Sequence, residues 1–312
     1  MTKEYRQQTW DAEVEHDCRQ IVRLAILEDL ERGHDWTTVA LAAEEAQSAA
    51  NLVARKPGVI AGIEAARIAL EEMEITAAWE PQVADGAHVE RGSIVAKLRG
   101  SARGLLTAER TLLNLMGRMS GIATLTAQYV AAIAGTKAKI YDTRKTTPGW
   151  RRLEKFSVRC GGGQNHRMGL YDGVLIKDNH LALGRQGPQA IRYTPAEAVQ
   201  RAKQFLRQHG AGQERFTEMM VEVEVDSLEQ LREVLPAGPD IVLLDNMPPT
   251  VLREAVAIRN QLAPTIELEA SGGITLETIR SVAETGVERI SSGALTHSAI
   301  VLDVALDWEE NL

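Results

Sequence analysis

The pattern of hydrophobic and polar positions in the first third of the chain differs from the pattern in the rest. Four short β-prone runs in the first third alternate with turn signals, at residues 51–54, 59–61, 79–83 and 94–98. A helical pattern covers residues 63–73, between the second and third of these runs. This arrangement predicts an α+β layer whose strands are joined by hairpin-like connections.

A long helix is expected after the last of these strands. Thr107 is a residue type that caps helix N-termini, and an apolar stripe follows it, formed by Leu112, Leu113, Leu115, Met116 and Met119. We expect the helix to continue to about Ala134. Gly117 and Gly121 are expected to interrupt or bend it, because glycine weakens a helix interior.

From residue 136 onward, short apolar runs alternate with amphipathic segments. The apolar runs lie at 138–141, 173–176, 220–225, 240–244, 265–268 and 287–290. Helical patterns separate the later runs, at 228–234, 250–261 and 276–285. The last four runs recur about every 20 to 25 residues, which is typical of βα units that build a parallel sheet. This spacing fits both a barrel and an open doubly wound sheet.

The residues at the ends of these strands favour the barrel. Charged residues or Ser-Gly turns follow one strand after another: Arg144-Lys145, Lys177, Glu224, Asp245, Ser271-Gly272-Gly273 and Ser292-Gly293. In a barrel, the loops after the strands converge on one mouth, where catalytic and binding groups lie. We therefore predict an N-terminal α+β sandwich domain over residues 1–115 and a TIM-like α/β barrel over residues 116–296. A helix within residues 297–312 is expected to dock on the first domain.

Acidic and apolar side chains alternate in two of the predicted strands. In residues 221–225 the alternation places Glu222 and Glu224 on one face and three valines on the other. If the valines pack against helices, both glutamates point into the barrel, and Glu267 and Glu269 repeat this pattern. Unpaired buried acids are costly, so we expect cations, a metal or sugar hydroxyls to meet them. Internal ion pairs with Lys or Arg are the alternative, chiefly for Glu222 and Glu267.

Two Ser-Gly turns follow the last two strands. Ser271-Gly272-Gly273 precedes a helix expected near Thr275, and Ser292-Gly293-Ala294 precedes another. Glycine lets the backbone approach a ligand closely, and a helix N-terminus offers unpaired N–H groups. The last two strands of a barrel are the usual place for a phosphate site. We interpret these two turns as phosphate-binding cups.

Charge is concentrated in the middle of an otherwise acidic chain. The formal net charge of −8 argues against a general nucleic-acid-binding protein. Residues 144–177 nevertheless contain eight basic residues and two acidic ones. A solvated basic loop would explain this count, and so would cations gathered around a small anionic ligand.

Composition excludes several classes of protein. The chain has 312 residues, of which 44% are hydrophobic and 25% charged, a balance typical of globular proteins with a sizeable core. No run approaches the ~18 uninterrupted apolar residues that a membrane helix needs. The polar residues 1–11 do not resemble a secretory signal, and two cysteines are too few for a disulfide framework. We expect a cytoplasmic protein that binds neither membrane nor nucleic acid.

Three motifs lie in the basic stretch: Asp142-Thr-Arg-Lys-Thr-Thr-Pro-Gly149, Arg159-Cys-Gly-Gly-Gly-Gln-Asn-His-Arg167 and Leu175-Ile-Lys-Asp-Asn-His180. Others run along nearly the whole chain, among them Glu109-Arg-Thr-Leu-Leu-Asn114, Leu244-Asp-Asn246 and Ser292-Gly-Ala-Leu-Thr296. Together they resemble the quinolinate phosphoribosyltransferase family, which has the type II phosphoribosyltransferase barrel. The resemblance implies transfer of phosphoribosyl from phosphoribosyl pyrophosphate to quinolinate with decarboxylation, giving nicotinate mononucleotide, pyrophosphate and CO₂ in NAD biosynthesis.

The resemblance also implies residues that bind quinolinate. Its carboxylates would be held by four cations, with His166 beside the ring: Arg110, Arg144, Arg167 and Lys177. Guanidinium groups suit carboxylates because they donate two parallel hydrogen bonds. In the family, the residue that matches Arg110 reaches in from the neighbouring subunit, so a homodimer is implied.

Lys145, Glu224 and Asp245 are the residues that the resemblance assigns to the donor and to catalysis. Lys145 would contact phosphoribosyl pyrophosphate. Glu224 and Asp245 would bind ribose hydroxyls and support Mg²⁺, directly or through water, since Mg²⁺ prefers a few carboxylates plus substrate oxygens. The two cups would hold the 5-phosphate with Ser271, Gly272, Gly273, Ser292, Gly293 and Ala294.

Three other functions fit parts of the sequence. A non-catalytic homologue could use the same pocket to bind anions, but the intact basic and acidic positions argue against it. A barrel lyase or aldolase could use Lys177 as a Schiff-base amine. A nicotinate-specific transferase is the nearest alternative, but it has no need for cations that hold a second carboxylate.

Overall fold

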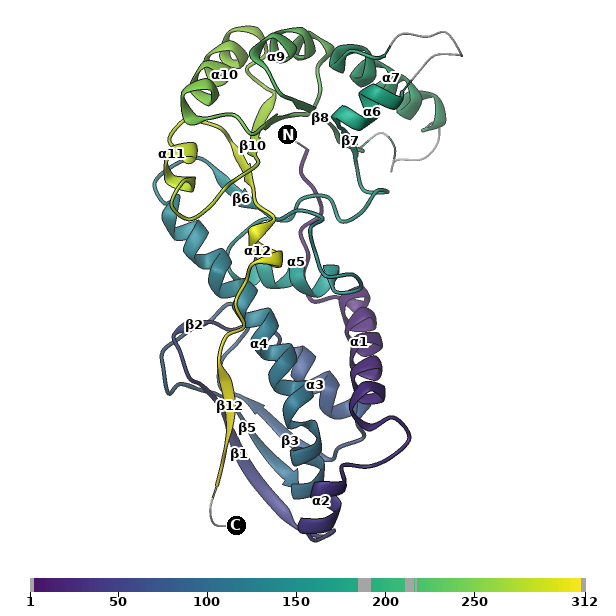
Figure 1. Cartoon of the computed structure of the whole chain (residues 1–312), viewed down its shortest axis with the longest axis vertical. Coiled ribbons are helices and arrows are strands. Elements are labelled where there is room, and N and C mark those ends of the chain that lie inside the picture. Colours follow the sequence, from purple (N-terminus) through teal and green to yellow (C-terminus); the bar gives the residue numbers. More distant parts are fainter. Residues whose placement is uncertain (1–2, 185–191, 211–215, 217, 310–312) are drawn as a thin grey trace. The chain divides into compact units, whose positions relative to one another are not determined.

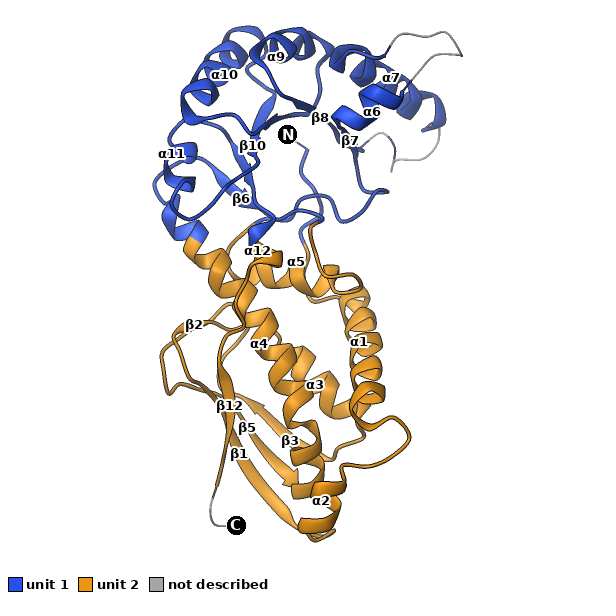
Figure 2. Cartoon of the chain, viewed as in Figure 1, with its two compact units in different colours: residues 1–7, 129–144, 164–294 blue, residues 8–128, 145–163, 295–312 orange. Residues whose placement is uncertain are grey.

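The structure, a computed structural model, describes residues 3–184, 192–210, 216 and 218–309. The chain forms two compact units, each assembled from separate stretches of sequence (Figure 2). Unit 1 contains residues 1–7, 129–144 and 164–294, and unit 2 contains residues 8–128, 145–163 and 295–312. The sequence analysis joined residues 297–312 to the first domain, but it did not predict that residues 1–7 belong to the barrel unit or that residues 116–128 and 145–163 belong to unit 2.

Unit 1 is built on a six-stranded parallel sheet. Its strands lie in the order β6 (Lys139–Tyr141), β11 (Arg289–Ser291), β10 (Glu267–Ser271), β9 (Ile241–Asp245), β8 (Val221–Val225) and β7 (Val174–Ile176). Every pairing between neighbours is parallel, so the carboxyl ends of all these strands lie at one edge. Strands that follow one another from β7 to β11 are neighbours, as repeated βα units produce.

Helices pack around the outside of this sheet (Figure 1). They are α6 (Asp178–Leu183), α7 (Pro195–His209), α9 (Leu228–Val234), α10 (Pro249–Leu262) and α11 (Ile279–Ala283), with a 3₁₀ turn at Leu235–Ala237 and the short α12 (Ala294–His297) after β11. The α/β fold of the predicted barrel is thus confirmed, with strands inside and helices outside. Among the described residues, hydrogen bonds do not join β6 to β7, so the ring of strands is not closed by backbone pairing.

Unit 2 is the predicted α+β layer. Its four-stranded antiparallel sheet has the order β12 (Val304–Trp308), β1 (Gln47–Ala54), β5 (Ile94–Ser101) and β3 (Ala77–Pro81), and β2 (Gly58–Val59) pairs separately with β4 (His88–Val89). Its helices are α1 (Ala12–Leu30), α2 (Trp36–Leu41), α3 (Ile63–Glu72), α5 (Arg151–Cys160) and most of α4 (Ala102–Ala132). Leu52, Leu98 and Leu112 belong to one buried cluster that joins the sheet to α4.

The end of the chain forms a strand, which corrects the helix predicted within residues 297–312. β12 pairs antiparallel with β1, with Leu306 opposite Leu52. Val304 and Leu306 are buried, and the intervening positions are more exposed, which is the two-residue period of a strand. The prediction failed because the apolar positions there fit both periods, and the neighbouring edge of β1 decides between them.

Helix α4 corrects a second expectation, because it runs without interruption through Gly117 and Gly121. A Cβ at Gly121 would overlap the carbonyl oxygen of Ile300, and a Cβ at Gly117 would lie 2.7 Å from Val301 Cγ1. The two glycines therefore serve close packing of residues 300–302 on the helix rather than a bend. None of the described helices is both long and apolar enough to span a membrane.

Candidate active site

The predicted alternation in the strands of unit 1 sets the polar character of one face of the sheet. Through β9, the register aligns Glu222 with Glu267 and Glu224 with Glu269. Residues aligned in this way point to the same side of a sheet, so all four glutamates share one face. The valines of β8 point to the opposite face and are buried. The sequence prediction that these acids face inward is correct.

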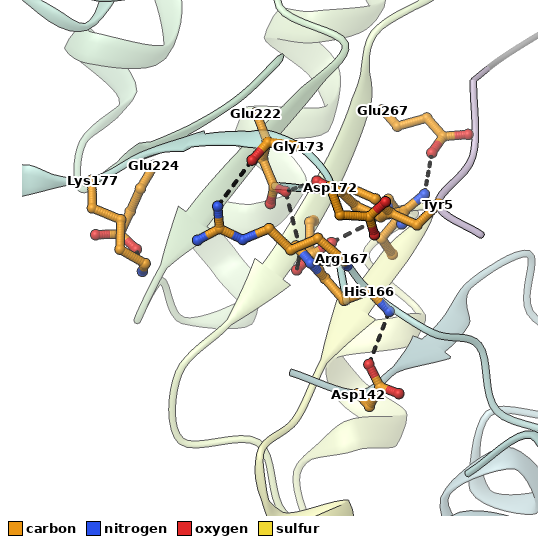
Figure 3. A network of polar contacts seen from close by, with 12 residues as sticks. Tyr5, Asp142, His166, Arg167, Asp172, Gly173, Lys177, Glu222, Glu224 and Glu267 are labelled. Atoms are coloured by element: carbon orange, nitrogen blue, oxygen red, sulfur yellow. Dashed lines mark hydrogen bonds and ion pairs between the residues drawn. The ribbon is translucent and has the colours of Figure 1, made fainter. Parts of the chain in front are cut away.

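Lys177, Glu224 and Asp245 lie at the carboxyl edge of the sheet. Lys177 directly follows β7, and its Nζ forms an ion pair with Glu224 Oε2 (Figure 3). Asp245 ends β9, and its Oδ2 accepts a hydrogen bond of 2.8 Å from Asn246 Nδ2. Side chains of both charges, from three neighbouring strands, thus meet at this edge.

The two Ser-Gly turns lie at the same edge and are joined to each other. Ser292 Oγ donates a hydrogen bond of 3.3 Å to the carbonyl of Ile274, which directly follows the first turn. The same Oγ accepts from the Ala294 N–H at 3.3 Å. Gly272 has a φ of +94°, and a Cβ there would overlap Asn246 Oδ1, so this position requires glycine. Gly273 and Gly293 complete the two turns.

The helix expected near Thr275 begins later. Residues 276–278 form turns, and α11 starts at Ile279. Thr275 N donates to Thr278 Oγ1 at 3.0 Å, a local bond that competes with helix formation at this point. The first turn is therefore followed by a loop rather than by a helix N-terminus.

Asp142 fixes the loop that carries His166 and Arg167. This buried aspartate directly follows β6. Its Oδ1 accepts the backbone N–H of His166 at 2.9 Å, and its Oδ2 accepts from Asn165 Nδ2 at 2.6 Å. The sequence motif that begins at Asp142 and the motif that ends at Arg167 are thus tied together by one carboxylate.

The imidazole of His166 is buried among acids of the sheet interior. Its Nε2 lies 3.0 Å from Glu222 Oε2 (Figure 3). The same nitrogen lies 3.5 Å from Glu269 Oε1. Its Nδ1 accepts the backbone N–H of Arg167 at 2.8 Å. Because Nδ1 is an acceptor, the proton of a neutral ring resides on Nε2, which donates it to Glu222. Both ring nitrogens are therefore used within the protein.

Arg289 of β11 neutralises the other interior acids. Its guanidinium is 1% exposed and lies 3.1 Å from Glu267 Oε2 and 3.2 Å from Glu269 Oε2. The alternative that Glu267 forms an internal ion pair is therefore correct. Glu222 is paired with His166 and Tyr5 instead, because Tyr5 Oη donates to Glu222 Oε2 at 2.9 Å.

The two central glutamates differ in acidity. Burial would raise the pKa of Glu222, but His166 and the hydrogen bond from Tyr5 hold it below its usual value. The pKa of Glu269 is raised by burial and by the negative charge of Glu222. Glu222 is therefore the more acidic of the two carboxyl groups.

His166, Glu222 and Glu269 are also the described residues whose ligand atoms come close enough for a metal, all within 4.8 Å of one another. One oxygen of each glutamate is engaged, since His166 donates to Glu222 Oε2 and Arg289 pairs with Glu269 Oε2. Glu222 Oε1 and Glu269 Oε1 are buried and have no hydrogen-bond partner among the described residues. We interpret the cluster as a hydrogen-bonded framework for the loop above it.

Arg144 and Arg167 are two cations held near each other in unit 1. Arg167 is 6% exposed, its Nη1 donates to the carbonyl of Gly173 at 3.1 Å, and its buried Nε has no partner among the described residues. Burial lowers the pKa of Arg167, and the positive charge of Arg144 lowers it further. Neither arginine forms an ion pair within the described part of the chain. A buried guanidinium in this state is suited to bind an anion.

Arg110 and Lys145 belong to unit 2. Arg110 is exposed on α4, and its side chain makes no hydrogen bond or ion pair with the residues that the structure describes. Lys145 is exposed, and its carbonyl accepts from Thr296 Oγ1 at 2.7 Å. The other predicted site residues lie in unit 1, which itself brings together Arg144, His166, Arg167, Lys177, Glu224, Asp245 and the two Ser-Gly turns.

Sequence reasoning missed Tyr5, Asp142 and Arg289 as parts of this network. The position of Arg289 carried a signal, because it is a charged residue within the predicted strand 287–290, and the structure aligns it with Glu269. The position of Tyr5 carried none, since it lies outside every predicted element and meets Glu222 across 217 positions of sequence.

Comparison with known proteins places the chain in a family. The model of the quinolinate phosphoribosyl transferase N-terminal domain matches residues 35–120, and the C-terminal domain model matches residues 122–307. The carboxylating nicotinate-nucleotide pyrophosphorylase of Mycobacterium leprae is 45% identical over 292 residues, which cover 93% of this chain and 96% of that protein. The probable enzyme of the same name from Bacillus subtilis is 40% identical over 290 residues, covering 93% and 92%.

Solved structures agree with this placement. The nicotinate-nucleotide pyrophosphorylase from Francisella tularensis matches with a TM-score of 0.86 at 33% identity, covering 98% of this chain and 100% of that chain. The enzyme of the same name from Ehrlichia chaffeensis matches with a TM-score of 0.79 at 36% identity, covering 93% and 98%. The chain belongs to the quinolinate phosphoribosyltransferase family.

Proposed function

We propose that the protein transfers phosphoribosyl from phosphoribosyl pyrophosphate to quinolinate and decarboxylates the product to nicotinate mononucleotide. The observation that carries this proposal is the buried Arg167 guanidinium, which has an unpartnered Nε and a second cation, Arg144, near it. A pyridine with two adjacent carboxylates offers the negative charges that such a pair requires. Family membership supplies the donor, since relatives over nearly the full length carry the name of this activity.

In this proposal the cations position the nucleophile. Arg144, Arg167 and Lys177 hold the two carboxylates, which aligns the ring nitrogen with the anomeric carbon of the donor. The bond from that carbon to nitrogen forms as the bond to pyrophosphate breaks. Lys145 stabilises the negative charge of the departing pyrophosphate, and the Ser271 and Ser292 turns hold the 5-phosphate.

Decarboxylation follows from the new charge on the ring. Once the nitrogen is ribosylated, the pyridinium accepts the electron pair left on C2 when the neighbouring carboxylate departs as CO₂, and a proton then replaces that carboxylate. A tight contact with a cation would resist the loss of this carboxylate, so the contact has to be weak. The Lys177–Glu224 ion pair weakens it, because Glu224 competes with the substrate for the ammonium group.

Mg²⁺ is part of the proposal, with Glu224 and Asp245 as the residues that would hold it. Both are acids at the carboxyl edge of neighbouring strands, and hard carboxylate oxygens fit this cation. Asn246 engages Asp245 Oδ2 and leaves the second carboxylate oxygen for a ligand. When bound, Mg²⁺ would neutralise charge on the pyrophosphate of the donor.

We also propose a homodimer in which Arg110 is contributed to the partner's site. Arg110 lies on α4, one turn after Thr107. The first turn of α4 is bonded to α2, because Arg103 Nη2 donates to the carbonyl of Val39 at 3.2 Å. Large exposed apolar side chains gather on that segment, among them Trp36, Val39 and Leu41. Patches of this kind mark interaction surfaces.

We place the enzyme in the cytosol, in line with two cysteines that form no disulfide.

The test is an assay of purified protein with quinolinate, phosphoribosyl pyrophosphate and Mg²⁺. We expect CO₂ and nicotinate mononucleotide in equal amounts, and no turnover when nicotinate replaces quinolinate. Equal rates with nicotinate would identify a nicotinate transferase, and the absence of both products would refute the proposal. Borohydride trapping of a carbonyl substrate on Lys177 would instead support a lyase.

A further inference from the structure

The segment Lys3–Gln7 lies inside the arc of strands of unit 1, where its trace runs in purple between β10 and β7 (Figure 1). Its first two residues are bonded to residues in or next to the sheet. Lys3 Nζ lies 3.5 Å from Asp240 Oδ1, and Glu4 receives hydrogen bonds of 3.0 Å from Arg289 and 2.8 Å from Tyr141 Oη. Lys3 is thus bonded to the residue before β9, and Glu4 is bonded to residues of β6 and β11.

Gln7 fixes the segment to the loop that carries His166. Its Nε2 donates to the carbonyl of Asn165 at 3.1 Å, and its Oε1 accepts the N–H of Asn165 at 2.8 Å. One side-chain amide therefore satisfies both backbone groups of the residue before His166. These two hydrogen bonds fix the position of the loop relative to the strands.

Tyr5 makes the contact that reaches the imidazole itself. The phenol ring is 4% exposed and stacks on the His166 ring, with centroids 4.6 Å apart and planes inclined by 27°. Its hydroxyl donates to Glu222 Oε2, the oxygen that also receives the His166 Nε2 proton. Burial raises the pKa of Tyr5, so the hydroxyl stays a donor.

A glycine next to the Tyr5 ring provides the space that the phenol occupies. A Cβ at Gly173 would lie 3.0 Å from Tyr5 Cε1, so the glycine before β7 lets the phenol reach the sheet interior. The carbonyl of the same Gly173 accepts from Arg167 Nη1. Tyr5 is thus in contact with the histidine and with the residue that holds the neighbouring arginine.

We infer that Tyr5 is a positioning residue for His166: stacking and the shared Glu222 oxygen hold the imidazole in the orientation in which Nδ1 accepts the Arg167 N–H and Nε2 carries the proton, with one face covered by the phenol. A ring held in this way cannot rotate to offer a nitrogen to the substrate. It offers its remaining face and edge to the pyridine ring. The inference rests on the proposed function for the identity of the ligand, but the state of His166 is a property of the protein without substrate.

The test compares Tyr5→Phe, which keeps the stack, with Tyr5→Leu, which removes both contacts. Long-range ¹H–¹⁵N correlation spectra of the substrate-free protein report which imidazole nitrogen carries the proton, and His166→Asn assigns the signal. We expect a clear Nε2–H signature in the wild type, a small shift in Tyr5→Phe, and averaged ring nitrogens in Tyr5→Leu. In kinetics, Tyr5→Leu should raise KM for quinolinate about tenfold and leave KM for phosphoribosyl pyrophosphate within about twofold.

Tyr141→Phe is the matched control. It also removes a buried tyrosyl hydroxyl, but one whose partner is Glu4. It should change neither the His166 signals nor the ratio of the two KM values. An unaltered His166 tautomer in a folded Tyr5→Leu protein would overturn the inference, and so would equal rises of both KM values. If the wild type turned over no quinolinate, the proposed function would fail while the spectra still decided the role of Tyr5.

Discussion

At the scale of single residues, the site is defined by which charges have partners. The interior acids are all compensated, by Arg289, His166 and Tyr5. Arg167 differs because it forms no ion pair within the described chain, its Nε is buried and unpartnered, and its neighbour Arg144 is also a cation. A protein tolerates such an arrangement where a ligand of opposite charge completes it.

Arg167→Ala should therefore weaken the binding of quinolinate selectively. The loss of a charge-assisted, buried contact corresponds to about 2–3 kcal/mol, or roughly 30- to 150-fold in KM for quinolinate. KM for phosphoribosyl pyrophosphate should change about twofold or less. Steady-state kinetics with each substrate varied in turn measure the two values. Equal increases would remove Arg167 from the carboxylate site, and the exposed Arg253→Ala on α10 serves as the control for the loss of one positive charge.

Asp245→Asn tests the proposed Mg²⁺ residues. The amide keeps the size of the side chain but removes its negative charge, so the Mg²⁺ concentration for half-maximal rate should rise by about tenfold. KM for the donor should rise with it, and quinolinate binding should be little affected. A titration of the initial rate with MgCl₂ measures this. An unchanged Mg²⁺ dependence would count against Asp245 as a residue near the metal.

The inward direction of Glu222 and Glu224 was predictable, because a strand has a period of two and the valines mark the outer face. The position of Tyr5 was not, because nothing local distinguishes that tyrosine from a surface residue. Its environment arises from the register of β8 with β9 and from the path of residues 3–7, which are properties of the folded unit.

At the scale of elements, most strands of unit 1 were predictable within one or two residues, since apolar runs and turn signals mark them. The end of the chain was not. Val304 and Leu306 belong to a strand only because the edge of β1 is available to pair with them. The need for glycine at positions 117 and 121 likewise comes from outside α4, because residues 300–302 pack against the helix there.

Gly121→Ala should therefore destabilise the protein, although alanine favours a helix over glycine by about 1 kcal/mol. The new methyl group would meet the carbonyl of Ile300 and force residues 300–302 away from the helix. We expect a loss of about 2 kcal/mol, typical of an overpacked site, seen as a lower thermal midpoint. Gln128→Ala, at an exposed position of the same helix, is the control and should have little effect. A higher midpoint for Gly121→Ala would contradict this packing.

The ion pair between α10 and the residue before β11 gives a pH-dependent contribution to stability. Arg259 Nη1 and Nη2 donate to Glu288 Oε2 and Oε1, at 3.0 and 2.9 Å. Burial would raise the pKa of Glu288, but the hydrogen bonds of Arg259 and Lys137 hold it below its usual value of 4.5. The folded state thus binds this proton less readily than the unfolded state. The contribution is fully present above pH 4.5 and is lost as the pH falls through the lower, folded pKa.

Glu288→Gln should lower the free energy of unfolding by about 2 kcal/mol at pH 7, because Arg259 keeps a neutral acceptor but loses its counter-charge. The difference between the variant and the wild type should shrink as the pH is lowered from 5 to 3. Urea unfolding at a series of pH values measures this. A difference that stays constant over that range would mean that Glu288 is not ionised in the folded protein.

At the scale of the whole molecule, the arrangement of the chain was the hardest feature to predict. Sequence patterns identify a sandwich followed by a barrel, and the apolar positions near the end of the chain indicated that the last residues return to the first domain. They did not show that residues 3–7 enter unit 1 before unit 2 begins. That crossing leaves no local pattern, because it is fixed by long-range contacts such as those of Tyr5. The assembly of two copies is likewise a matter of surfaces rather than of periodicity.

The proposed dimer can be tested by complementation between two inactive variants, Arg110→Ala and Lys177→Ala. If each site takes Lys177 from one subunit and Arg110 from its partner, a mixed dimer contains one site with both residues and one site with neither. Random exchange of subunits would then restore about one quarter of the wild-type activity, since half of the dimers are mixed and each has one intact site. Mixing after unfolding and refolding together, followed by the CO₂ assay, measures this. If Arg110 instead acted within its own subunit, every site would lack one residue and the mixture would stay as inactive as its components.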